Sequence, residues 1–440
     1  MYDHLSRLVD VYRLCRRPHL SRRAVGRYRQ QKLRHLIEHA YRTVPYYRAL
    51  FGLAGITPAD IRDVADLGKI PITTKRDLKE ADPSFYLSTS FRASKLRTLK
   101  TTGSTGIPLV LRVSNAESLM SHFIRMRAAR ECGLRSRDHV ARIRTGNPKE
   151  APAVWRFVQK LGFWRQSIVN ALDSPQKMAK DLLDLNPDVV TGYSGALARV
   201  GQIIVADHGR TLPVRFVVGG ADMLTPLVLK HIEAAFQAPV YDHYACQEFG
   251  LIASQCRASG LYHICDDNVI LEVLKDGRPA REGERGEVVA TSLHMRAMPF
   301  IRYNLDDLVT VGPASCSCGR NYPTLKSIEA KKQDYFQLPG GRDFYPWTIC
   351  LLLLEEAPWI MQVQLVQERV DRVVMRAEAR PKPSTAEIAA LREKILPLLG
   401  PDVEFEVEIV PQLEPGPGGK FWVRRSLVHS LYEGGAGDPK

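Results

Sequence analysis

Hydrophobic positions in the middle of the chain follow two alternating spacings. Residues 187–195, 214–222 and 238–245 carry short apolar runs that end in glycine or polar residues, a pattern typical of buried strands. Residues 196–209 and 226–236 carry apolar side chains three and four positions apart, which predicts helices. Strands and helices that alternate with short connections predict parallel pairing in an α/β sheet, with ligands at the carboxyl ends of the strands.

The pattern changes on either side of this region. A helix is predicted over residues 114–132, with Ser114 as its N-terminal cap and Gly133 as its stop, and another within residues 32–51. Antiparallel strands joined by polar turns are predicted from about residue 268 onward, at 269–277, 286–294 and 298–312.

The C-terminal part of the chain has its own alternation. Residues 345–410 predict a helix, two strands, a second helix and a third strand, which indicates a second domain that begins near Gln333. The predicted fold class is therefore α/β, with a large N-terminal domain of parallel and mixed sheets, residues 1–332. A small α+β domain, residues 333–440, follows it.

Length, composition and charge narrow the class of protein. A chain of 440 residues with 45% hydrophobic and 25% charged residues is typical of a globular protein with two or three domains. No uncharged apolar run is long enough to span a membrane, and the N-terminus lacks a secretory signal pattern, so a cytoplasmic location is expected. The basic helical N-terminus, residues 1–50, holds 12 of the 62 Lys and Arg residues. It could bind an anionic surface, but a solvated helical face is the commoner reason, and no nucleic-acid motif accompanies it.

A short glycine-rich stretch suggests phosphate chemistry. Its spacing does not match a Walker loop, yet backbone amides freed by glycine and neighbouring hydroxyls can hold phosphate oxygens; a plain turn is the alternative. The stretch consists of Thr101, Thr102, Gly103, Ser104, Thr105 and Gly106. Further along, Glu248 and a carboxylate pair, Asp306 and Asp307, stand at predicted strand ends, and Lys420 lies on a glycine-rich turn. Carboxylates at such ends could hold Mg²⁺ or the two hydroxyls of a ribose.

The order of these motifs resembles the adenylate-forming acyl ligases. They are a Thr/Ser-rich glycine loop, Tyr-x-x-x-Glu at Tyr244, Arg-Tyr-x-x-x-Asp at Arg302, and a C-terminal Gly-Lys. Within that superfamily the chain resembles the phenylacetate–CoA ligase branch and its capsule-biosynthesis relatives, from about residue 30 to residue 428. The resemblance implies a small C-terminal domain that moves as a lid.

The same resemblance assigns a role to each residue. The glycine-rich loop would close over the β- and γ-phosphates of ATP, Glu248 would hold Mg²⁺, and Asp307 would bind the ribose. Lys420, Glu248 and Arg302 would form the catalytic set, with Lys420 contacting the carboxylate and the α-phosphate. The residues expected around the adenine of ATP or AMP are Gly219, Gly220, Ala221 and Tyr244.

Eight cysteines include one set with metal-ligand character. Three cysteines and one histidine could form a closed tetrahedral zinc site, which some members of this branch possess at the matching positions. The four are Cys256, His263, Cys316 and Cys318, with Cys265 as a competing ligand. Cys246 has no basic partner nearby in sequence and is interpreted as a pocket-lining residue rather than a nucleophile.

The expected reaction has two steps. ATP activates a carboxylic acid as acyl-AMP, and coenzyme A then takes the acyl group; an alternative acceptor is an amine or a sugar hydroxyl. Tyr193, Phe123 and Met126 are expected to line the acid pocket or the core, a mixture that suits an aryl or other apolar acid. A different class of hypothesis is a non-catalytic protein that binds ATP or an anionic surface. A homodimer is an open possibility.

Overall fold

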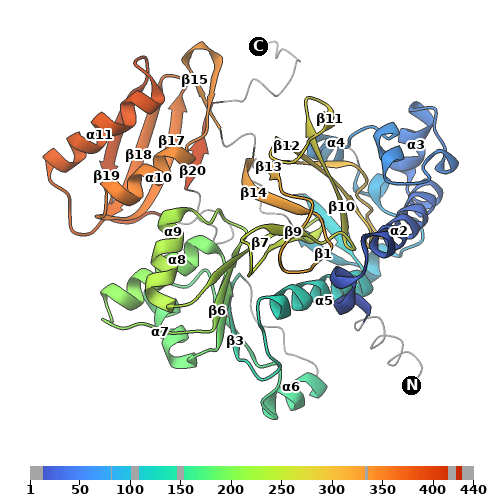
Figure 1. The fold of residues 1–440 in the computed structure, drawn as a ribbon, viewed down its shortest axis with the longest axis horizontal. Helices are drawn as coiled ribbons and strands as arrows, with labels where there is room; N and C mark the ends of the chain where they lie inside the picture. The colour runs from blue at the N-terminus through green and yellow to red at the C-terminus, as the bar shows by residue number, and fades with distance from the viewer. Residues whose placement is uncertain are drawn as a thin grey trace. The chain divides into compact units, whose positions relative to one another are not determined.

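The structure is a computed structural model that describes residues 13–80, 82–100, 109–145, 153–331, 335–414 and 423–428. The chain divides into two compact units, each built from two stretches of sequence (Figure 1). The first unit comprises Met1–Leu134 and Tyr241–Glu329, and the second comprises Arg135–Val240 and Ala330–Lys440. The predicted boundary near Gln333 falls among residues outside the described part, and the division into 1–332 and 333–440 stays a prediction.

The first unit combines helices with a mainly antiparallel sheet. Its sheet has the strand order β11-β10-β12-β13-β14-β9-β8-β7, and β1 and β2 form a separate antiparallel pair. The helices are α2 (Arg22–Thr43), α3 (Pro45–Leu53), α4 (Lys75–Glu80) and α5 (Asn115–Glu131). The strands are β1 (Arg97–Lys100), β2 (Val110–Val113), β7 (Val240–Cys246), β8 (Gly250–Gln255), β9 (Tyr262–Ile264), β10 (Val269–Lys275), β11 (Arg278–Pro279), β12 (Arg285–Ser292), β13 (Tyr303–Val311) and β14 (Thr324–Lys331).

Local sequence explains where the helices of this unit begin and end. Helix α5 starts after Ser114, as the sequence predicts. The backbone N–H of Ser114 donates to Glu117 at 2.6 Å in a reciprocal capping box. The helix expected within 32–51 is instead two helices, α2 and α3, because Pro45 has no N–H and begins a new helix at its first turn. Strand β13 starts later than predicted, since Arg302 has a φ of 46° and interrupts the extended backbone.

The second unit contains a parallel sheet and a smaller, four-stranded one. Strands β6, β5, β3 and β4 pair in parallel in that order, which confirms the parallel pairing predicted for residues 187–195 and 214–222. The order of the smaller sheet is β19-β18-β17-β20. Its central pair is antiparallel and its two outer pairs are parallel.

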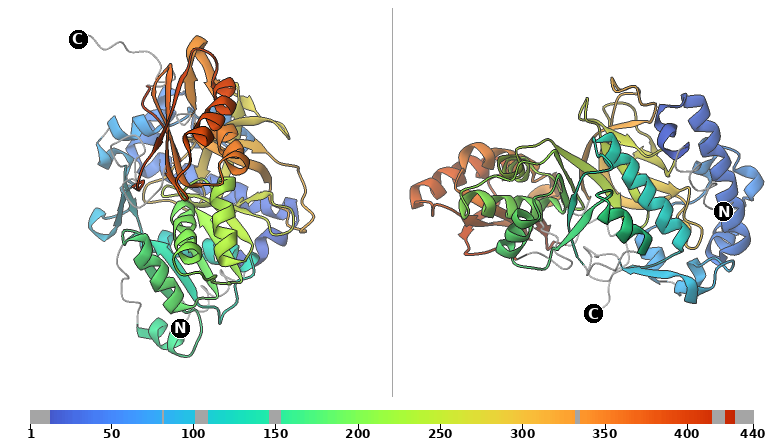
Figure 2. Two further views of the ribbon diagram at one scale, coloured as in Figure 1. Left: turned by 90° about the vertical axis from the view of Figure 1, so that its left-hand side faces the viewer. Right: turned by 90° about the horizontal axis from the view of Figure 1, so that it is seen from below.

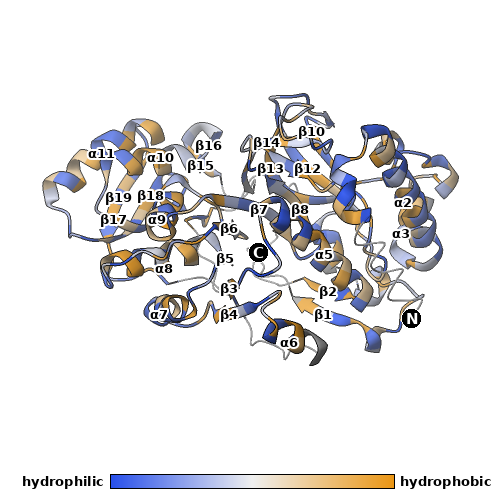
Figure 3. Cartoon of the chain, turned by 60° about the horizontal axis from the view of Figure 1, so that its bottom comes forward, coloured by the Kyte–Doolittle hydropathy of each residue, from blue (hydrophilic) through white to orange (hydrophobic). Residues whose placement is uncertain are grey.

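The elements of the second unit follow the predicted alternation. Both views of Figure 2 show α10 and α11 on one face of the four-stranded sheet, and Figure 3 shows that these helices carry apolar positions beside polar ones. The helices are α6 (Ala153–Lys160), α7 (Pro175–Leu185), α8 (Ser194–Ala206), α9 (Pro226–Phe236), α10 (Trp347–Glu356) and α11 (Thr385–Leu399). The strands are β3 (Val140–Arg144), β4 (Gln166–Asn170), β5 (Val189–Gly192), β6 (Phe216–Gly220), β15 (Phe336–Leu338), β16 (Arg342–Phe344), β17 (Ile360–Arg369), β18 (Arg372–Ala379), β19 (Glu404–Ile409) and β20 (Arg424–Ser426).

Each unit buries its own apolar cores. In the second unit, one core joins α7, α8 and α9 to the parallel strands, and another joins α10 and α11 to β17, β18 and β19. Among the described residues, no helix is both long and apolar enough to cross a membrane.

Candidate functional site

Two of the predicted ATP contacts meet in the first unit. The hydroxyl of Tyr244, on β7, donates to Oδ2 of Asp307, on β13, at 2.5 Å. Burial first, and then the Asp307 carboxylate, raise the pKa of Tyr244 well above its ordinary value. The tyrosine therefore stays a neutral donor that orients the carboxylate, although 63 positions separate the two residues in sequence.

The structure separates the two neighbouring aspartates. Asp306 is exposed, has a φ of 59°, and its N–H donates to Oδ1 of Asn304 at 2.8 Å. Asp307 is half-buried and makes the contact with Tyr244. Of the two candidates for the ribose carboxylate, Asp307 is thus the one that lies beside the aromatic ring expected near the adenine.

Glu248 lies just beyond the end of β7 and is 8% exposed. Burial and the nearby Glu248 carboxylate raise the pKa of the Cys246 thiol well above its usual range. A protonated thiol is a poor nucleophile, which agrees with the interpretation of Cys246 as a residue other than a nucleophile. Burial is the largest cause of the raised pKa of the Tyr244 and Tyr303 hydroxyls, and the nearby Glu248 carboxylate raises the pKa of both further.

The described contacts of Arg302 are with other parts of the first unit. Its guanidinium lies 3.1 Å from Glu272 and donates to the carbonyl oxygen of Ile70 at 2.6 Å. Its backbone carbonyl accepts from the N–H of Thr73. The described contacts therefore join three segments of the first unit, and a catalytic role for Arg302 stays a prediction.

The glycines expected near the adenine lie in the second unit. Gly219 and Gly220 end β6, and Ala221 follows with a φ of 65°, which turns the backbone sharply. A Cβ atom at Gly219 would lie 2.7 Å from the hydroxyl oxygen of Ser194, at the start of α8. Glycine therefore lets β6 and α8 approach each other here without a shift of the Ser194 hydroxyl.

The three residues expected to line the acid pocket are half-buried. Tyr193 immediately precedes α8, packs on the core of the second unit, and its hydroxyl lies 3.4 Å from the hydroxyl of Thr145. Phe123 and Met126 lie on α5 of the first unit, and Phe123 packs against a buried cluster there. A role in acid binding stays a prediction for all three. The glycine-rich loop, Thr101–Gly106, and Lys420 lie outside the described residues.

The predicted metal ligands meet in the first unit. The four ligand atoms of Cys256, His263, Cys316 and Cys318 all lie within 4.8 Å of one another. Sγ of Cys256 is 3.7 Å from Sγ of Cys316, and Sγ of Cys318 is 3.2 Å from Nε2 of His263. Tetrahedral Zn²⁺ with bonds of about 2.3 Å to sulfur places ligands roughly 3.8 Å apart, so the spacing fits. Cys265, the competing ligand, is not part of this group.

The protonation of two of the four ligands suits a metal, whereas burial raises the pKa of the Cys318 thiol. Although burial opposes it, hydrogen bonds from Ser259 and Arg320 lower the pKa of Cys256 to about 6. Burial, helped by the charge of Arg320, lowers the pKa of His263 to about 4. A thiolate and a neutral imidazole are the forms that bind metal.

Sequence reasoning missed two arginines that form ion pairs and hydrogen bonds near the candidate metal ligands and α5. Arg320 donates to Sγ of Cys318 at 3.3 Å and pairs with Glu131 on α5. Arg127, also on α5, forms two hydrogen bonds with the fully buried Asp267, at 2.7 and 2.9 Å. The position of Arg320 directly after Cys-x-Cys-Gly could have indicated a role beside the cysteines. Nothing in the sequence distinguishes Arg127 from any other arginine in a predicted helix.

Comparison with known proteins gives a consistent set of relatives. No family model matches the chain. The chain is 27% identical over 333 residues to the phenylacetate-coenzyme A ligase of Escherichia coli, covering 71% of this chain and 72% of that protein. It is 25% identical over 364 residues to the Thermus thermophilus phenylacetate-coenzyme A ligase, covering 80% of each chain. Protein CapK of Staphylococcus aureus is 22% identical over 374 residues, 81% of this chain and 79% of that one.

Solved structures share the fold. A 2-hydroxyisobutyryl-CoA ligase in the postadenylation state matches with a TM-score of 0.78 at 20% identity, covering 95% of this chain and 92% of that one. An anthranilate CoA ligase in complex with anthranoyl-AMP matches with a TM-score of 0.55 at 15% identity, covering 76% and 66% of the two chains. The expected α/β fold class is confirmed by these likenesses.

Proposed function

We propose that this chain, an adenylate-forming ligase by its fold and by its homology to the phenylacetate-coenzyme A ligases, activates a carboxylic acid with ATP. The acid forms acyl-AMP with release of pyrophosphate, and coenzyme A then displaces AMP to give an acyl thioester. The observation within the molecule that best supports this reading is the bond between Tyr244 and Asp307. It joins the Tyr-x-x-x-Glu motif to the Arg-Tyr-x-x-x-Asp motif, and both contain residues assigned to the nucleotide. The Tyr244 hydroxyl orients the Asp307 carboxylate.

The proposed roles follow from the charge that develops during adenylation. A carboxylate attacks a phosphorus atom surrounded by negative oxygens, so cations and donors must stabilise the additional charge. Lys420 and the loop Thr101–Gly106 supply those groups in the proposal, and Asp307 accepts hydrogen bonds from the ribose hydroxyls. Glu248, a buried carboxylate at a strand end, would hold Mg²⁺, which neutralises phosphate charge when bound.

A second ion is proposed for a structural role. The donor set of three sulfurs and one imidazole nitrogen, at the observed spacing, suits Zn²⁺. A zinc ion bound there would hold the loop between β13 and β14 against β9 and the turn that precedes it. Because all four positions are taken by side chains, no open coordination position remains for a substrate.

The relatives bear on the identity of the acid and of the acceptor. The names of the relatives favour an aryl acid such as phenylacetate, whereas the solved structure with the TM-score of 0.78 is named for a hydroxy acid. Coenzyme A is the favoured acceptor. The likeness to Protein CapK is the reason to retain transfer to an amine or a sugar hydroxyl as a second candidate. A cytoplasmic location belongs to the same proposal.

The experiment that tests the function is acid-dependent exchange of pyrophosphate into ATP. Pools of aryl, hydroxy and fatty acids are supplied in turn, with Lys420→Ala as the inactive control. We expect one pool to stimulate exchange and the variant to lose about 10²-fold or more of it, the scale of a lost transition-state donor. Exchange that no pool stimulates, while ATP still binds, would instead support a binding protein without ligase activity.

Once the acid is known, adding coenzyme A separates the two acceptors. A thioester product detected by mass spectrometry supports the favoured reaction. Accumulation of acyl-AMP that coenzyme A does not consume, followed by consumption with an amine or a sugar, supports the second candidate.

A further inference from the structure

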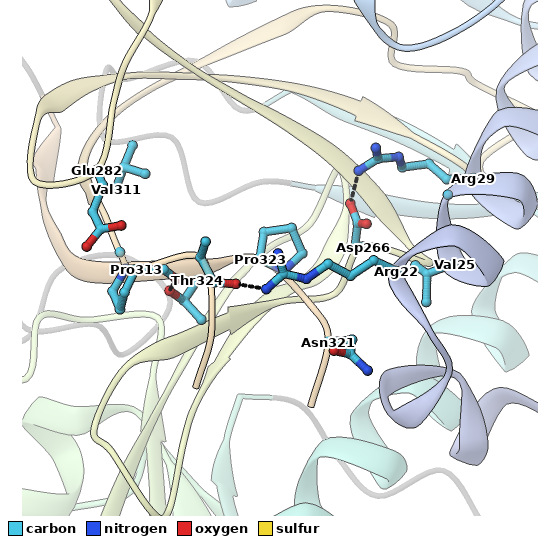
Figure 4. A pocket seen from close by; sticks show the side chains of 13 residues that line it. Arg22, Val25, Arg29, Asp266, Glu282, Val311, Pro313, Asn321, Pro323 and Thr324 are labelled. Atoms are coloured by element: carbon cyan, nitrogen blue, oxygen red, sulfur yellow. Dashed lines mark hydrogen bonds and ion pairs between the residues drawn. The ribbon is translucent and has the colours of Figure 1, made fainter. Parts of the chain in front are cut away.

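A cavity of about 410 Å³ lies in the first unit, at the N-terminal end of α2. Its walls come from the first turns of that helix, from Asp266, from residues 311–314, and from Asn321, Pro323 and Thr324, which flank the candidate metal-ligating cysteines (Figure 4). The volume falls within the range of about 300–1,000 Å³ that is typical of small-molecule sites. None of the lining residues is among the ATP contacts, acid contacts or metal ligands expected from the sequence.

Two arginines of α2 line the cavity. Arg22 donates to the carbonyl oxygen of Ala314 and has no carboxylate partner among the described residues. Arg29 pairs with Asp266 at 2.6 Å. Figure 4 shows both side chains extending from α2 toward Asp266 and the segment that carries Pro323 and Thr324. A guanidinium offers five N–H donors, so each arginine retains capacity for a ligand.

The surroundings favour an anion over a cation. The N-terminal end of a helix carries a partial positive charge, and Arg22 is the first residue of the 22-residue α2. Asp266 is buried and is balanced by Arg29, while Glu282 is exposed at the edge, where water and salt screen its charge. The remaining wall is partly apolar, with Val25 and Pro313 among its residues.

We propose that this cavity binds a small organic anion, whose phosphate or carboxylate oxygens accept hydrogen bonds from Arg22 and Arg29. The apolar wall contacts the organic part of the ligand. The inference goes beyond the proposed ligase function and does not depend on it. Because Cys316 and Cys318 lie between the two wall segments at 311–314 and 321–324, the occupant of the cavity would contact the same loop that a bound zinc ion would hold.

Gly26 offers a way to close the cavity without disturbing the fold. A Cβ atom at this position would meet no atom within 4 Å, so the helix opens onto free space there. A leucine would extend into that space, and it would also stabilise the helix, since glycine costs about 0.5–1 kcal/mol in a helix interior. The Gly26→Leu variant is therefore expected to fold at least as well as the natural chain.

The test is calorimetric titration of the full chain with phenyl phosphate, inorganic phosphate and benzoate. We expect phenyl phosphate or benzoate to bind with a Kd of about 1 mM or tighter, and each of Gly26→Leu and Arg22→Met to weaken that binding at least about tenfold. Arg23→Met is the matched control, because Arg23 is an exposed neighbour on α2 that does not line the cavity. It should change the Kd by less than about twofold.

The comparison of probes identifies the anionic group, and the variants identify the place. A probe that binds at the ATP or acid contacts would still bind to the Gly26→Leu variant. Only the probe binding that this variant loses is therefore assigned to the cavity. The proposal is wrong if no probe binds at about 10 mM, or if either cavity variant binds as the control does. Pyrophosphate exchange is measured in parallel, so loss of the anion site and failure of the ligase assignment give separate results.

Discussion

Replacing Arg127 by methionine removes one partner of the most completely buried ion pair among the described residues of the first unit. The side chains of Arg127 and Asp267 are 3% and 0% exposed, and two hydrogen bonds join them. Arg17 remains, but its guanidinium lies 3.4 Å from the carboxylate and makes a single contact. A buried carboxylate deprived of its principal partner is expected to cost about 3–5 kcal/mol of stability.

The assay must report on the first unit. All five tryptophans lie between residues 135 and 240 or beyond residue 330, so their fluorescence follows the second unit. Hydrogen exchange read by mass spectrometry on peptides from α5 and from residues 262–269 reports directly on the pair. A loss of 3–5 kcal/mol corresponds to exchange on the order of 10²–10⁴-fold faster where the exchange rate follows the opening equilibrium.

A matched substitution and a double variant complete this test. Arg278 pairs with Glu284 on the surface of the same unit, so Arg278→Met should leave exchange unchanged within error. Arg127→Met combined with Asp267→Leu removes the buried charge as well and should recover a substantial part of the loss. If Arg127→Met behaves like Arg278→Met, or if the double variant is worse than the single one, the reasoning about buried charge at this site is refuted.

Four further changes test the site and its surroundings. Asp307→Asn should raise the KM for ATP about 10–100-fold in the exchange assay, because the ribose loses a charged acceptor. Glu248→Gln should lower the exchange rate about 10²-fold and shift its dependence on Mg²⁺ to higher concentration, whereas an unchanged Mg²⁺ profile would contradict the assignment. Cys318→Ser should reduce bound zinc, measured by elemental analysis, from about one per chain to a small fraction, while Cys15→Ser, outside the cluster, should retain it. Burial raises the pKa of Asp242 to about 6, so the folded state binds the proton more tightly than the unfolded chain. Stability should therefore fall as pH rises from about 4 to 6, by about 2–3 kcal/mol relative to Asp242→Asn, and equal pH profiles of the two proteins would disprove it.

The elements of the fold were largely readable from the pattern of apolar positions. The strand at 214–222 and the helices at 114–132 and 226–236 appear where their periodicity predicts them, because one buried face is enough to select a helix or a strand locally. Strands β3 and β4 were missed, since "VARIR" and "QSIVN" contain charged and polar residues that mask a short apolar run. Their strand character comes from the neighbours with which they pair.

The residue types of the candidate site were also present in the sequence. Glycines before a turn, a carboxylate after a strand, and three cysteines with one histidine are compatible with nucleotide and metal chemistry by their donor atoms, although each also has a purely structural interpretation. Family resemblance added the roles, and the homologues agree with it. The donor atoms are a property of the side chain, so they can be identified from the sequence without a structure.

Distances between remote residues belong to the tertiary structure. Whether Asp306 or Asp307 faces Tyr244 depends on one left-handed residue in β13, and whether Cys265 joins the metal group depends on how two turns meet. The pair of Arg127 with Asp267 and the cavity beside α2 each unite segments more than 100 positions apart. A sequence pattern encodes which side chains avoid water, but the partner that each buried charge finds is selected only when the whole chain packs.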